Sequence, residues 1–146
     1  MTEKTARQRW MAVLARASRS ELAALLESVG PPPAHDLLKP PETGTMMVEG
    51  RAGGAGRRFN LGEATVTRCV VRLADGAMGF SWALGRDGGK ARLAAILDGL
   101  LQAEPEAGPL GRGVAELSAR QQAARENASR KAAATRVDFF TLVRGA

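Results

Sequence analysis

Arginines and glycines surround the single cysteine of this chain in the stretch GGAGRRFNLGEATVTRC, residues 53–69. Free backbone N–H groups beside guanidinium groups are the chemistry that cradles a phosphate. The stretch is not a P-loop, because GxxxxGKS/T is absent and the residues that follow it are typical of an extended strand. Two interpretations stay open here: an ordinary loop, or an anion contact made by Arg51, Arg57 and Arg58.

Cys69 and His35 are each the only residue of their type, so their number excludes an intrachain disulfide and a Cys/His zinc cage. Cys69 and Arg68 point to opposite faces of an expected strand, which leaves the thiol buried and inert. His35 follows a triple proline, and only the adjacent Asp36 could partner it, so we expect a solvent-facing loop histidine. The sequence therefore predicts no catalytic residue and no metal site.

The elements that must position these residues begin with a helical segment, because apolar residues recur at steps of three and four over residues 4–29. Ser18 and Glu21 have the spacing of a capping box, which predicts two helices or a kink at that point. Gly30 and the three prolines after it should end the helix. We expect a loop from there to about Thr43, followed by a short strand.

A β-hairpin is the clearest local signal, because Asp75-Gly76 lies between two strand-like runs and is a preferred type I′ pair. That turn places Leu73 opposite Met78. Alternation then assigns all the large side chains of the second strand to one core face. The residues of this expected core face are Thr67, Cys69, Val71 and Leu73 with Met78, Phe80, Trp82 and Leu84.

The opposite face of the hairpin would carry Arg68 and Arg72 above small residues, with Arg86 just beyond the second strand. These arginines are either solvated charges or a surface for a phosphate or an acidic subunit, and both interpretations stay open. Next, Asp87 should cap a helix that covers the core face, through Leu93, Ile96, Leu97, Leu100 and Leu101.

A long polar helix follows the linker at 105–113, and the chain ends in VDFFTLVRGA, which we expect to form an extended apolar arm. The fold class is thus α+β: a small antiparallel sheet with a central hairpin packed by helices, plus a C-terminal helix and arm. We expect one domain over 1–146, consisting of a helical segment (1–30), the hairpin sheet with its packing helix (43–104), and the helix with the arm (112–146).

Composition narrows the class of partner. A formal charge of +6 would attract nucleic acid, a phosphate-rich ligand or an acidic protein. No apolar run approaches the roughly 18 residues of a membrane span, and the N-terminus lacks a signal-peptide core, so we expect a cytoplasmic protein.

Several blocks together carry a family resemblance: FNLGEATVTR, Gly85-Arg86-Asp87 and the tail VDFFTLVRG, supported by LKPPETGTMMVEGR and AAILDGL. They resemble the G subunits of the bacterial carbon–phosphorus lyase system, the PhnG family. The likeness runs from Arg9 to Gly145, although residues 103–130 match only in being helical and polar.

The resemblance implies a required subunit without a catalytic constellation of its own, in a cytoplasmic core complex with H, I and J subunits, two copies of each, and an L protein that joins transiently. There, methylphosphonate displaces adenine from C1 of the ribose of ATP, which gives α-D-ribose 1-methylphosphonate 5-triphosphate. The I subunit would supply the active site, and the Fe–S cluster and S-adenosylmethionine would belong to J. This chain would bind no cofactor.

The resemblance also gives the arm and the arginines a role, as contacts to a neighbouring subunit, most directly I. The residues of this expected partner arm are Phe139, Phe140, Leu142 and Arg144. The alternative is a free-standing basic protein that binds nucleic acid. The scarcity of aromatic residues outside the expected core argues against it, because single strands are bound largely by base stacking.

Overall fold

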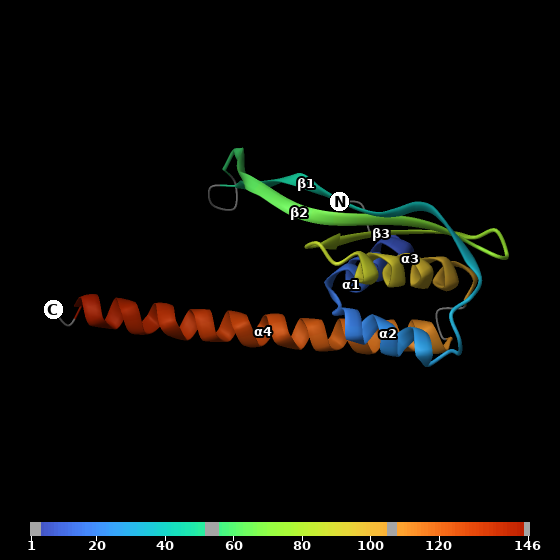
Figure 1. Cartoon of the computed structure of the whole chain (residues 1–146). Coiled ribbons are helices and arrows are strands. Elements are labelled where there is room, and N and C mark those ends of the chain that lie inside the picture. Colours follow the sequence, from blue (N-terminus) through green and yellow to red (C-terminus); the bar gives the residue numbers. More distant parts are fainter. Residues whose placement is uncertain (1–3, 52–55, 105–107, 145–146) are drawn as a thin grey trace.

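In the computed structural model, one sheet rests on layers of helix (Figure 1). The structure describes residues 4–51, 56–104 and 108–144, with side chains through residue 135. The element order is α1 (Ala6–Arg16), α2 (Arg19–Glu27), β1 (His35–Arg51), β2 (Arg58–Leu73), β3 (Met78–Leu84), α3 (Gly88–Ala103) and α4 (Pro109–Arg144). The strands form an antiparallel sheet in the order β1-β2-β3, which confirms the α+β class.

The two N-terminal helices form where the sequence predicts them. Ser18 is the N-cap of α2, its hydroxyl accepts from the Glu21 N–H, and the Glu21 carboxylate accepts from the Ser18 N–H. This reciprocal pair satisfies two backbone donors that a helix start otherwise leaves open, so α1 ends and α2 begins without a linker. Leu14 and Leu22 then enter the core.

β1 is longer than expected, and the predicted loop up to Thr43 is wrong. The strand begins at His35, and its pairing with β2 shifts between Leu37 and Lys39 and again between Lys39 and Glu42. Prolines cannot donate to a ladder, but they are tolerated at bulges and on edge strands. Since β1 is an edge strand and Pro40-Pro41 fall at its second register shift, the prolines interrupt the strand without ending it.

The hairpin forms, but its predicted register is wrong by one residue. Arg72 pairs with Met78, and the Leu73 N–H donates to the Ala77 carbonyl, which leaves a three-residue loop. Within this turn only Gly76 has positive φ, at 93°, so the turn is not type I′. It is a type I turn closed by a glycine bulge, the usual three-residue loop. The one-residue shift exchanges the two faces of β3 relative to β2.

The buried face of β3 is therefore its small-residue face. Gly79, Ser81 and Ala83 point toward α3, where the Ser81 hydroxyl donates to the Ala91 carbonyl over 2.6 Å. A Cβ on Gly79 would lie only 1.8 Å from the Ala95 carbonyl oxygen. The backbones of β3 and α3 thus lie nearly in contact. Asp87 caps α3 as predicted, and its Oδ1 accepts from the Lys90 N–H.

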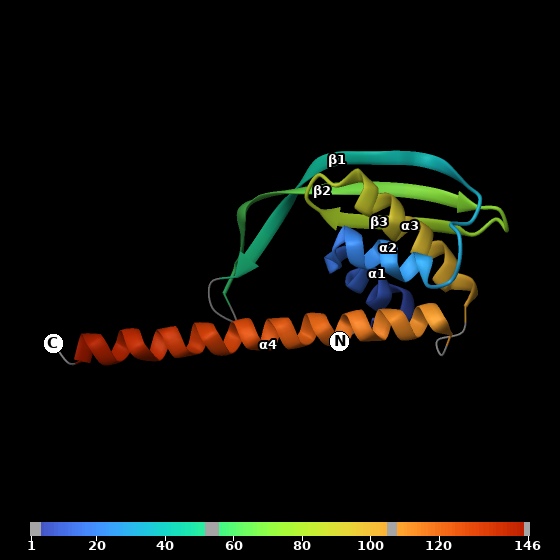
Figure 2. The same ribbon diagram turned by 60° about the horizontal axis from the view of Figure 1, so that its bottom comes forward.

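Helix α3 lies on one face of the sheet, α1 lies beside α3 along the edge strand β3, and α2 and α4 lie beyond them (Figures 1 and 2). No described helix crosses the opposite face, which we call the outer face, although Arg7 and Met11 of α1 border it beside Phe80 and Trp82. At one end, residues 45–51 and 58–65 continue past the end of β3 as a two-stranded ribbon, the β1–β2 ribbon. Figure 2 shows this ribbon projecting from the helical layers.

The C-terminal helix is longer than predicted. Helix α4 packs through Leu110, Val114 and Leu117, and every described side chain from 122 to 135 is exposed. The segment expected as an extended arm continues the helix to Arg144, so this part of the prediction is wrong. The apolar residues of VDFFTLVRGA would lie on both faces of a strand and were interpreted as an arm that needs cover, but the backbone continues as one helix to Arg144.

Candidate functional site

The outer face carries every large side chain of β3. The exposed fractions are 40% for Met78, 36% for Phe80, 46% for Trp82 and 69% for Leu84. The sequence placed these four residues in the core. The one-residue shift in register instead puts them on the outer face, where α1 borders Phe80 and Trp82 at the edge of the sheet.

Apolar side chains continue from β3 onto the β1–β2 ribbon. Met46 and Val48 pair with Ala64 and Gly62, and directly paired residues of antiparallel strands share a face. Leu61 lies over Gly50, since a Cβ there would meet the Leu61 side chain at 2.8 Å. The exposed apolar members of this part of the outer face are Met46, Val48, Phe59 and Leu61.

Arginines stand on the same face. The Arg68 guanidinium lies over the Trp82 ring, 5.3 Å from its centroid, and Arg7 of α1 lies 5.4 Å from the centroid of Phe80. Cations over aromatic faces are attracted by the ring quadrupole. Arg72 lies beside Asp36 of β1, with 3.8 Å between Nη2 and Oδ2. The predicted arginine face therefore exists, but it is apolar and aromatic rather than a floor of small residues.

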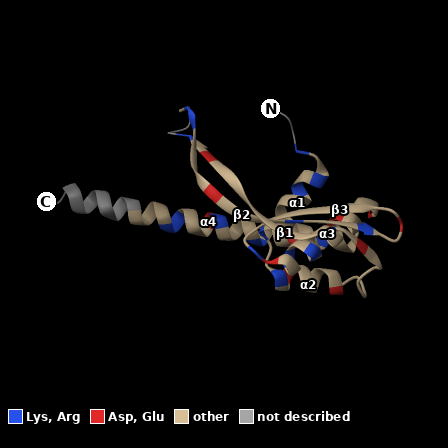
Figure 3. Ribbon diagram, turned by 45° about the horizontal axis from the view of Figure 1, so that its top comes forward, with Lys and Arg blue, Asp and Glu red and all other residues tan. Residues whose placement is uncertain are grey.

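The other predicted anion contacts separate into two places. Arg51 and Arg58 pair across the β1–β2 ribbon, with Arg57 exposed beside them, so basic residues gather at its tip (Figure 3). Arg58 also lies 3.8 Å from Glu49. Residues 52–55 of the glycine-rich stretch lie outside the described residues, so the phosphate cradle stays a prediction. Arg86 is exposed beyond β3, away from this tip.

Sequence reasoning missed a buried carboxylate, that of Asp98 in α3, which is fully buried. Its Oδ1 accepts from Trp10 Nε1 (2.8 Å) and Arg7 Nε (3.2 Å), and its Oδ2 accepts from Arg7 Nη2 (2.8 Å) and the Phe80 N–H (2.9 Å). This carboxylate raises the pKa of Arg7. It also satisfies an outward-facing N–H of edge strand β3, so it fixes α1, α3 and β3 together.

Cys69 and His35, the two residues with side chains that could be reactive, are both held within the fold. Cys69 is buried, as predicted, and burial raises the pKa of its thiol, which disfavours the reactive thiolate. His35 was predicted to lie in a loop, but it is the first residue of β1. Its Nδ1 lies 2.9 Å from the Pro33 carbonyl oxygen, and Arg92 Nη2 lies 3.0 Å from its Nε2. Both ring nitrogens are thus engaged within the fold.

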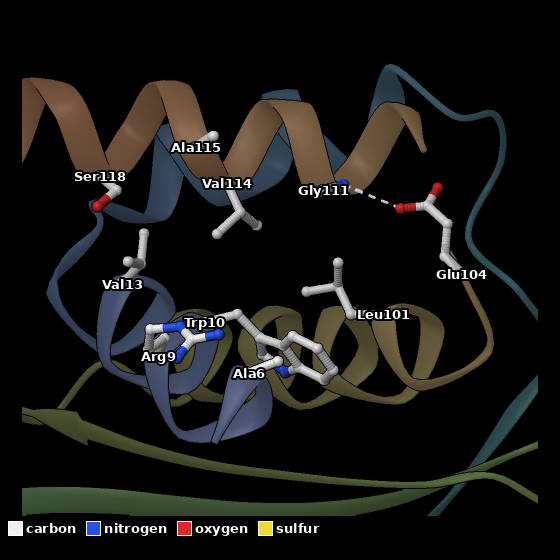
Figure 4. A pocket seen from close by; sticks show the side chains of 10 residues that line it. All are labelled: Ala6, Arg9, Trp10, Val13, Leu101, Glu104, Gly111, Val114, Ala115 and Ser118. Carbon is white, nitrogen blue, oxygen red and sulfur yellow. Dashed lines mark hydrogen bonds between the residues drawn. The ribbon is translucent and has the colours of Figure 1, made fainter. Parts of the chain in front are cut away.

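A cavity of about 300 Å³ opens between α1, α3 and α4 (Figure 4). Glu104 lies at one end of it, and its carboxylate accepts from the N–H groups of Leu110 and Gly111 at the start of α4. That carboxylate therefore serves as a helix cap rather than as a free catalytic group. The remaining lining is mostly apolar and includes Trp10, Val13, Leu101 and Val114, with Arg9 as the cation.

The fold and its surfaces define a class of protein: a small α+β chain whose main surface feature is a broad apolar and basic sheet face. Within the described ranges, no group of three or more His, Cys, Asp and Glu side chains could hold a metal ion. Among the described residues, no helix is long and apolar enough to cross a membrane.

The sequence matches the family described as phosphonate metabolism protein PhnG over residues 5–145, and the chain belongs to this family. It is 43% identical over 139 residues to the alpha-D-ribose 1-methylphosphonate 5-triphosphate synthase subunit PhnG of Rhizobium meliloti (strain 1021). That alignment covers 95% of this chain and 89% of the relative. Family membership confirms the resemblance and gives no support to the nucleic-acid alternative.

Proposed function

We propose that this chain is a subunit of an α-D-ribose 1-methylphosphonate 5-triphosphate synthase that works in the cytoplasm with H, I and J subunits, two copies of each, and with an L protein. The observation that carries the proposal is the 43% identity to a subunit of that name over nearly the whole of both chains. In the reaction, an oxygen of methylphosphonate forms a bond to C1 of the ribose of ATP. The bond from C1 to adenine breaks, and adenine leaves.

The role proposed for this chain is to hold and complete the assembly rather than to supply reacting groups. Its one thiol is buried, its histidine is engaged by Pro33 and Arg92, and its buried carboxylate accepts five hydrogen bonds. We further propose that the Fe–S cluster and S-adenosylmethionine belong to the J subunit, while this chain holds no cofactor of its own.

Reconstitution tests the proposal. Purified H, I, J and L proteins are incubated with ATP and methylphosphonate, with and without this chain, and adenine is measured by liquid chromatography. We expect adenine release to depend on the chain. An equal rate of release without it would contradict the proposed function.

The end of α4 provides a second test, because Phe139, Phe140, Leu142 and Arg144 are proposed to contact a neighbouring subunit, most directly I. A chain truncated before residue 137 is co-expressed with the H, I and J subunits and captured by an N-terminal tag. We expect the truncated chain to lose the subunits that the full chain captures. Full capture by the truncated chain would refute a role for this segment.

A further inference from the structure

Close packing forces the apolar side chains of β3 to face outward. Gly79 and Gly99 bring β3 and α3 so near to one another that the Gly79 Cα would lie 3.7 Å from a Cβ on Gly99. A residue larger than glycine at position 79 would collide with the carbonyl oxygen of Ala95. Phe80 and Trp82 therefore have no space on the inner side, and their exposure follows from the backbone packing.

The outer face has about the area of one side of a protein interface. From their exposed fractions, the four β3 residues and the four apolar residues of the ribbon together present roughly 700 Å². The largest apolar patch of a typical monomer is about 300–600 Å², and one side of a standard interface buries about 800 Å². This area is contiguous. Val66 pairs with both Leu84 and Gly44, and Met46 follows Gly44 by two residues on the same face of β1.

The charge on this face decides between the possible occupants. None of the ion pairs among the described residues involves Arg68, whose guanidinium is stacked on Trp82. Arg7 and Arg72 are paired with Asp98 and Asp36, but two copies meeting through this face would each present the Arg68 guanidinium to the other, and juxtaposed like charges disfavour an interface. Helix α4 of the same chain lies on the opposite side of the helical layers (Figures 1 and 2). An acidic partner therefore fits better than either a second copy or the chain's own helix.

We propose that the outer face is the docking surface for a different protein chain, one that presents an apolar segment flanked by aspartate or glutamate. The apolar side chains would pack on Trp82 and Leu84, and the carboxylates would reach the outward edge of the Arg68 guanidinium. The inference rests on the proposed function for the identity of the partner, which is then another subunit of the same synthase.

Capture of co-expressed H, I and J subunits by the tagged full-length chain tests this surface. The first variant is Trp82→Glu with Leu84→Glu, which places carboxylates within the apolar patch. Its matched control is Val29→Glu, at a residue that is also 40% exposed but lies after α2, on the helical side. A central tryptophan is a typical interface hot spot, so we expect the captured partner to fall by about 30-fold or more, with no change in the control.

The second variant is Arg68→Glu. It changes a single exposed residue, so we expect it to fold even if the double variant does not. We expect it to weaken capture by about tenfold, and we expect Arg68→Lys to retain most of it, since lysine keeps the attraction to a carboxylate. Arg16→Glu, an equal change of charge at the end of α1, is the control. Circular dichroism of every variant checks that its helix and strand content is unchanged.

The outcomes are distinct. Unaltered capture by folded Trp82→Glu/Leu84→Glu and Arg68→Glu variants would overturn the docking surface while leaving the proposed function intact. Failure of the wild-type chain to capture any subunit would refute the proposed function and this choice of partner together. A dimer of the isolated chain that dissociates in the Trp82→Glu/Leu84→Glu variant would assign the face to a second copy and overturn the inference.

Discussion

Replacing the buried Asp98 with asparagine should destabilise the fold by about 2–3 kcal/mol. Asparagine has nearly the same shape but keeps one acceptor oxygen, so its amide group must face the three donors of Oδ2, which are Arg7 Nη2, the Phe80 N–H and Gln102 Nε2. If the oxygen stays near Trp10 and Arg7 Nε, the Phe80 N–H loses its acceptor. An unsatisfied buried donor costs about 1–3 kcal/mol. Loss of the Arg7 ion pair adds less, because the Arg7 side chain is 39% exposed and can turn to water.

Urea unfolding monitored by circular dichroism measures this loss, and a calorimetric scan should show a midpoint lower by about 5–10 °C for a chain of this size. Arg7→Met is the comparison: it removes the cation beside a fully buried carboxylate and should cost about 3 kcal/mol or more, although Trp10 and the Phe80 N–H still donate. A loss below about 1 kcal/mol for either variant would refute the reasoning.

Three further predictions follow from the packing and the ionisable groups. Gly79→Ala should prevent folding or cost over about 3 kcal/mol in urea unfolding, whereas Gly44→Ala, in open space, should cost under about 1 kcal/mol. Cys69 should react with a thiol reagent only as fast as the chain unfolds; because its pKa is raised, stability should fall as the pH rises above the ordinary thiol value. The pKa of Glu21 is lowered, first by the hydrogen bond from the Ser18 N–H, so its contribution is present above the ordinary Glu pKa and is lost as the pH falls through the lower folded value. Glu21→Gln should therefore be less stable by about 0.5 kcal/mol at neutral pH and equal to the wild type in acid.

Local signals predicted the helix starts well, because capping depends on residues three positions apart. Ser18 with Glu21, and Asp87 with the Lys90 N–H, are contacts that a short sequence window contains. The long-range register could not be read in this way. Asp75-Gly76 suits a two-residue turn and equally a three-residue turn with glycine at its end, and the choice depends on how α3 packs against Gly79.

The candidate site was predicted only in part, because strand alternation is local whereas the register of the hairpin depends on long-range packing. Strand alternation placed Arg68 and Arg72 on one face correctly, but the one-residue shift changed their neighbours from small to aromatic. Asp98 carried a signal that was overlooked, since it is the single charge inside the apolar run LAAILDGLL. Its partner Arg7 lies 91 positions away, and no sequence window joins the two.

Helix α4 extends far beyond the part that packs against the other helices. At 1.5 Å per residue, the part beyond Gln121 is about 35 Å long, so a rotation of about 10° at its root would move its tip by about 6 Å. A contact at the tip alone would therefore position a neighbouring chain poorly. If the outer face of the sheet holds that chain as well, the second contact becomes intramolecular, and the effective concentration at the tip rises without any new interaction. The contact at the tip of α4 then adds to the affinity for the neighbouring chain, and the contact at the sheet fixes the position of that chain.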